Sequence, residues 1–181
     1  MTMLLAFAPF IAFAIIDRLL GSVAGLFAGA VVATALLIRD VAIAGKTPKV
    51  LDIGAAVLFS GIALYAVTFD PDWSIIAVRL YVDCGLFLIV VLSLVSGRPF
   101  TIQYARETVP EQFWASPEFL QKNYVISSVW ALAFAVLMAT ELTLLHAPQL
   151  SPRIGIFVIV GAIVGALKFT GWYSARDKSV A

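Results

Sequence analysis

The chain has 181 residues, of which 62% are hydrophobic and only 13% are charged, whereas an ordinary soluble domain carries about 25% charged residues. A soluble domain of this size could not bury so much apolar surface, and disorder requires the opposite composition, so both classes are excluded. Twelve basic and eleven acidic residues give a net charge of +1, which leaves no basic surplus for nucleic acid. We therefore expect one transmembrane domain over residues 1–181.

Six apolar segments follow one another along the chain. Backbone polar groups in lipid must be satisfied within the segment, so apolar runs of this length are expected to be helices. The first, residues 1–16 with Pro9, would rise about 24 Å against a hydrocarbon core of about 30 Å, so it either spans a locally thinned bilayer or enters and returns. The expected fold is an all-α membrane protein, a bundle of six hydrophobic helices over about 1–16, 19–38, 50–69, 73–96, 123–145 and 153–173.

The polar stretch 97–122 separates the fourth and fifth segments. It holds three prolines, charges of both signs and five aromatic residues, and aromatic side chains favour the depth of the lipid headgroups. We expect a cytoplasmic interfacial segment with one or two short helices, and Ser116 followed by Pro117 is typical of a helix start. The segment is either a docking platform for a partner or a hairpin that seals the floor of the bundle.

The basic residues divide unequally between the two sides of the membrane. If all six segments cross, nine of the twelve lie on one side, and the positive-inside rule makes that side the cytoplasm. Both termini and the 97–122 segment are then cytoplasmic; if the first segment does not cross, only the N-terminus changes side. The nine residues are Arg39, Lys46, Lys49, Arg98, Arg106, Lys122, Lys168, Arg176 and Lys178.

Charged residues inside the apolar segments are the strongest candidates for function, because an ionisable residue there costs about 2.5–3.5 kcal/mol on insertion scales. Arg79 and Asp83 are four residues apart and share a helix face, so we expect them to pair. Glu141 is expected at a similar depth, with Asp17 near the same side. One hypothesis is an intramembrane polar cluster lining an outward-facing cavity or a proton path. The other is a structural ion pair that locks the fourth segment against the fifth.

A polar stripe runs along the fifth segment. Asn123, Ser127 and Trp130 recur at helical spacing and share a face with Glu141. This stripe is either a polar path across the membrane or a bundle-facing surface whose side chains bond neighbouring helices.

Glycines recur at four-residue spacing in two segments. They are Gly21, Gly25 and Gly29 in the second, and Gly161 and Gly165 in the sixth. Small residues at this spacing let helix backbones approach closely. The pattern predicts packing within the chain or, for the first set, a homodimer face.

Catalytic and metal chemistry have few residues to use. The single cysteine, Cys84, excludes an intramolecular disulfide, and the single histidine, His146, is the only one available to a metal site or a catalytic triad. We expect no metal, no cofactor and no enzymatic activity.

Three stretches of the chain read GRPFTIQYARETVP, then FW, then NYVISSVWALAF. In these three stretches the chain resembles the bacterial intracellular septation protein A-type family of inner-membrane proteins. The resemblance implies a structural or scaffolding role in cell-envelope maintenance or division, with partner membrane proteins and no catalytic residues. The alternative is a small channel or transporter for protons, ions or small solutes that uses Arg79, Asp83 and Glu141. The resemblance rests on a loop motif of Arg98, Pro99, Gln103, Arg106, Glu107 and Trp114, with Asn123 and Trp130 after it.

Overall fold

A computed structural model describes residues 3–147 and 149–176 of the chain, and Lys178 lies outside them. The described residues form helices and no strand, which confirms the all-α prediction. Within these described ranges, five helices are long and apolar enough to cross a membrane, as expected of a multi-pass membrane protein. The elements are α1 (Met3–Ala6), α2 (Ala8–Leu20), α3 (Ser22–Ile38), the π-helical η1 (Arg39–Ile43), α4 (Val50–Phe69), α5 (Ile75–Val95), α6 (Phe100–Ala105), the 3₁₀-helical η2 (Glu111–Phe113), α7 (Pro117–His146) and α8 (Pro152–Ala175).

The first predicted segment does not form a single helix of spanning length. It forms the short α1 and the 13-residue α2, and α2 rises only about 20 Å. That length is well below the hydrocarbon thickness, and α2 is not among the five helices with the length and composition of a span. Gly21, with φ of +92°, ends α2 and starts α3, a backbone conformation that favours glycine.

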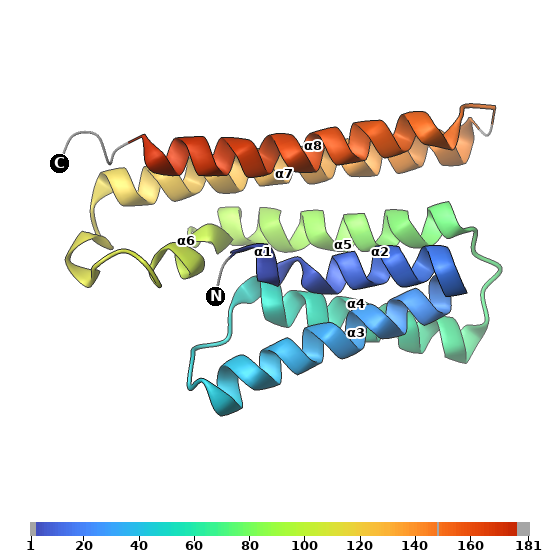
Figure 1. The fold of residues 1–181 in the computed structure, drawn as a ribbon, viewed down its shortest axis with the longest axis horizontal. Helices are drawn as coiled ribbons and strands as arrows, with labels where there is room; N and C mark the ends of the chain where they lie inside the picture. The colour runs from blue at the N-terminus through green and yellow to red at the C-terminus, as the bar shows by residue number, and fades with distance from the viewer. Residues whose placement is uncertain (1–2, 148, 177–181) are drawn as a thin grey trace. The chain divides into compact units, whose positions relative to one another are not determined.

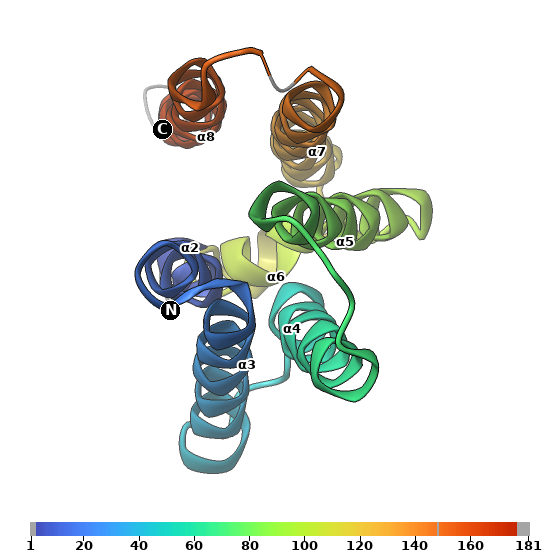
Figure 2. The same ribbon diagram turned by 90° about the vertical axis from the view of Figure 1, so that its right-hand side faces the viewer.

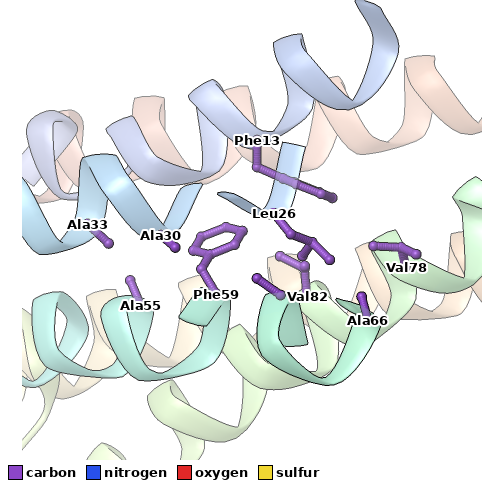
Figure 3. Close-up of a cluster of buried hydrophobic side chains, with 10 residues drawn as sticks. Phe13, Leu26, Ala30, Ala33, Ala55, Phe59, Ala66, Val78 and Val82 are labelled. Carbon is purple, nitrogen blue, oxygen red and sulfur yellow. The ribbon is translucent and has the colours of Figure 1, made fainter. Parts of the chain in front are cut away.

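The chain divides into two compact units, Met1–Ile89 and Val90–Ala181. In the first unit, α3 lies beside α2 and α4, as Figure 2 shows end-on. Phe59 of α4 is completely buried, with ring centroids 5.0 Å from Phe10 and 5.6 Å from Phe13. Figure 3 shows Phe59 reaching toward Ala30 of α3. Small alanines on α3 and α4 leave room for this ring, so the two helices pack closely around it.

The glycines of α3 contribute to the same packing. A Cβ atom on Gly29 would lie 2.6 Å from Phe59 Cδ1, and one on Gly25 would lie 2.9 Å from the backbone of Asp17. Both positions are buried, so this face packs within the chain, which was one of the two predicted roles of the stripe. A homodimer on the Gly21, Gly25 and Gly29 face stays a prediction, and this intramolecular packing disfavours it.

The second unit contains the end of α5, then α6, η2, α7 and α8. The helices α7 and α8 lie side by side as a hairpin (Figure 1), with Gly155 against the Leu144 side chain. The predicted start of α7 is confirmed, because Ser116 Oγ accepts a hydrogen bond from Phe119 N and Pro117 is the first helical residue. The two short helices α6 and η2 confirm that the polar stretch is partly helical.

Candidate functional site: polar groups of the two helical units

Asp17, near the end of α2, is the most enclosed charged group described in the first unit. Its side chain is 0% exposed, and both of its carboxylate oxygens are bonded. Arg79 of α5 donates from Nε and Nη2 to Oδ2, at 2.9 and 2.5 Å. Ser22 Oγ donates to Oδ1 at 2.7 Å. The carboxylate therefore connects the end of α2, the beginning of α3 and the beginning of α5.

The structure thus brings together two members of the predicted polar cluster. The sequence favoured Asp83 as the partner of Arg79, because local helical spacing is visible and a contact over 62 residues is not. Asp83 lies one turn further along α5 and is half-buried. Glu141 is buried on α7, in the second unit. A cavity shared by all four residues stays a prediction.

In the second unit, a hydrogen-bond network joins α6 to α7. Thr101 Oγ1 donates to the carbonyl oxygen of Asn123 at 3.0 Å and lies 2.8 Å from Ser127 Oγ. The single hydroxyl proton of Thr101 goes to the carbonyl, so Ser127 donates in the second bond. Asn123 Nδ2 donates to the carbonyl of Phe119 at 2.8 Å. Sequence reasoning missed Thr101, because a lone threonine between apolar residues carries no spacing signal.

Trp130 extends this contact surface to α8. Its ring is buried, and Nε1 donates to Thr170 Oγ1 at 3.1 Å. Thr170 Oγ1 in turn donates to the carbonyl of Ala166. The three residues of the predicted stripe, Asn123, Ser127 and Trp130, are therefore all buried and hydrogen-bonded to protein groups. These contacts favour the bundle-facing interpretation of the stripe.

The loop motif separates into buried and exposed residues. Pro99 is buried at the start of α6, and Trp114 Nε1 donates to the carbonyl of Val109 at 2.9 Å. The guanidinium of Arg106 lies 4.9 Å from the centre of the Trp114 ring, a cation–π contact. Of the remaining motif residues, Arg98 and Glu107 are exposed and Gln103 is half-buried.

A second charged group, at the end of α3, was noted in the sequence only for its positive charges. Asp40 lies in the π-helical turn η1, a feature often found at functional positions. It is buried, and Oδ1 accepts from Nε and Nη2 of Arg39 at 3.0 and 2.7 Å. Oδ2 is enclosed and accepts no hydrogen bond from the described residues. Lys49 and Asp52 are also buried at this end of the unit. The adjacent Arg39 and Asp40 at the end of a long apolar run are the sequence pattern that could have indicated this group.

A hollow of about 270 Å³ lies between the beginning of α7 and the end of α8. Lys122 Nζ donates to the carbonyl of Ser174, on α8, at 2.9 Å. Among the described residues, no three His, Cys, Asp or Glu side chains lie close enough to hold a metal ion. The hollow is lined by Glu118, Gln121, Lys122, Tyr173 and Arg176.

Comparisons with models of known protein families, with curated proteins and with solved structures give no match. The septation-family resemblance therefore stays a prediction carried by the loop motif.

Proposed function

We propose that this protein is a structural or scaffolding protein of the bacterial inner membrane that acts in envelope maintenance or division through partner membrane proteins. The observation that carries the proposal is the bonding of Asp17. A carboxylate that moves protons or binds a solute needs an accessible oxygen, whereas both oxygens of Asp17 are engaged and its side chain is fully buried. This charged group therefore holds helices together.

The polar stripe of α7 supports the same proposal. Its members bond to α6, to α8 and to the α7 backbone, so its polarity is used for helix packing. The segment between α5 and α7 presents Arg106, Glu107 and Phe113 outward. Exposed charged and aromatic residues on an ordered segment suit the docking of a protein partner.

Flux measurement is the first test of this proposal. The protein is reconstituted in liposomes, and proton and ion flux are compared among the wild type, Asp83→Asn and Glu141→Gln. A scaffold is expected to give the background flux of empty liposomes in all three samples. Flux that the two substitutions abolish would overturn the scaffold function.

A second candidate function, a small channel or transporter, is favoured by Glu141. This carboxyl group is buried within a helix long enough to span the membrane, and such residues commonly mark ion or substrate pathways. The flux experiment separates the two functions directly, because only the second requires a response to Glu141→Gln.

Cross-linking to a partner protein is an independent test of the scaffold function. A photo-cross-linking residue is placed at Glu107, which is exposed on the loop, and in a matched control at Val57, an exposed apolar position on α4. In cells, a discrete protein adduct is expected at position 107 and not at position 57. Identical patterns at both positions would contradict a docking role for the loop.

A further inference from the structure

The hollow between α7 and α8 lies where a membrane-spanning hairpin meets the lipid headgroups. Lys122 precedes the end of α7 at His146 by 24 residues, which corresponds to about 36 Å along the helix axis. The hydrocarbon core is about 30 Å thick, so Lys122 lies outside it when α7 spans the bilayer. On α8, Phe169, Trp172 and Tyr173 form a cluster of rings beside the hollow, as is common at the membrane interface.

The charges around the hollow favour an anion. Lys122 and Arg176 are basic and Glu118 is acidic, so the lining side chains carry a net charge of +1. The start of α7 and the end of α8 contribute partial charges of roughly +0.5 and −0.5, which cancel. The two helix ends therefore add no net charge to that of the lining side chains.

Two contacts orient the basic groups. The ammonium of Lys122 is held toward α8 by its hydrogen bond to the carbonyl of Ser174. The guanidinium of Arg176 lies 5.1 Å from the centre of the Trp172 ring, a cation–π contact that restricts its position. Guanidinium and ammonium groups together are a common donor set for phosphate.

We infer that this hollow binds the phosphate of an anionic phospholipid headgroup, of the phosphatidylglycerol type. A lipid is favoured over a soluble phosphate because exposed apolar side chains flank the site, with Trp172 57% and Leu120 36% exposed. These side chains offer a surface to the acyl chains while the headgroup fills the polar hollow. By the positive-inside expectation the lipid belongs to the cytoplasmic leaflet, where basic pockets between helices recognise anionic headgroups.

The test is lipid retention by the purified full-length protein, measured by native mass spectrometry after exposure to phosphatidylglycerol or phosphatidylcholine. The wild type is expected to retain one phosphatidylglycerol in preference to phosphatidylcholine. The double variant Lys122→Gln/Arg176→Gln is expected to retain at least several-fold less phosphatidylglycerol. Its matched control, Arg153→Gln/Lys168→Gln, removes two exposed charges from α8 and is expected to retain the lipid as the wild type does.

Three outcomes of this comparison would overturn the inference. They are equal loss in both double variants, equal retention of the two lipids by the wild type, and displacement of the lipid by millimolar inorganic phosphate, which would make the ligand a soluble anion. Glu118→Gln provides a second variant, at a residue that takes no part in the Lys122–Ser174 hydrogen bond or the Arg176–Trp172 contact. It removes the opposing charge and is expected to increase phosphatidylglycerol retention severalfold; a decrease would contradict an anion site.

Discussion

The carboxylate of Asp17 accepts hydrogen bonds from Arg79 and Ser22 although its side chain is completely removed from solvent. Removing one partner from a buried ion pair costs up to about 3–5 kcal/mol, because the other charge stays enclosed. Arg79 is 28% exposed, so water screens part of that cost. The stability of the first unit therefore depends on the pair remaining complete.

Asp17→Asn is expected to lower the Tm of the protein in detergent, because it leaves the Arg79 guanidinium facing a neutral amide. Asp72→Asn, an exposed change in the loop between α4 and α5, is the control and should leave the Tm unchanged. The double variant Asp17→Leu/Arg79→Met replaces the pair by apolar groups and is expected to recover most of the loss. A wild-type Tm in Asp17→Asn would show that the pair contributes nothing.

The helices α3 and α4 pack closely where Gly29 meets the ring of Phe59. Gly29→Ala places a Cβ atom 2.6–2.9 Å from three carbon atoms of the Phe59 ring, so the ring or the helices must shift. We expect a loss of about 1–3 kcal/mol in the free energy of unfolding.

Gly61→Ala is the matched control, since nothing lies within 4 Å of its Cβ position. Alanine has the higher helix propensity, so this change should be neutral or stabilising by up to about 1 kcal/mol. The measurement is denaturation of both variants in the same detergent. Equal effects of the two substitutions would contradict the close approach at Gly29.

The short helix α6 is attached to α7 by the hydrogen bonds of Thr101. Thr101→Val removes the hydroxyl that bonds Ser127 and the Asn123 carbonyl, and leaving these buried groups unsatisfied costs about 1–3 kcal/mol. Faster amide hydrogen exchange is expected in Phe100–Ala105. Thr108→Val, at an exposed position that bonds only its own segment, is the control and should exchange like the wild type; equal exchange in both variants would exclude the proposed attachment.

At the scale of the whole molecule, the alternation of spans predicts on which side each loop lies. In a Cys84→Ala background, single cysteines replacing Thr47 and Glu107 are expected to react with a membrane-impermeant maleimide from the same side. Cysteines replacing Asp72 and Ser151 should react from the opposite side. Labelling of the cysteines at positions 107 and 151 from the same side would contradict a membrane-spanning α7. The side from which a cysteine near the N-terminus reacts shows whether the first segment crosses the membrane.

The long helices could be predicted because the mean hydropathy of about twenty consecutive residues indicates whether a helix can lie in the hydrocarbon core of a membrane. Five predicted segments correspond to helices of spanning length, and the shortness of the first was visible from its residue count. The partner of Arg79 could not be predicted. Helical periodicity identifies residues that are one turn apart on the same helix, whereas Asp17 is 62 positions away from Arg79 in the sequence. Thr101 and the Lys122–Ser174 contact were missed for the same reason: they depend on how helices meet.

The bond between Asp17 and Arg79 also has a consequence for biosynthesis. A ribosome adds about 5–20 residues per second, so roughly 3–12 s separate the synthesis of two residues 62 positions apart. During this interval Asp17 is without the guanidinium that neutralises it in the finished protein. The helix α2 is also too short to be held across the bilayer by its own apolar length. We therefore expect the final placement of α2 to follow the emergence of α5, although α2 is synthesised before α5.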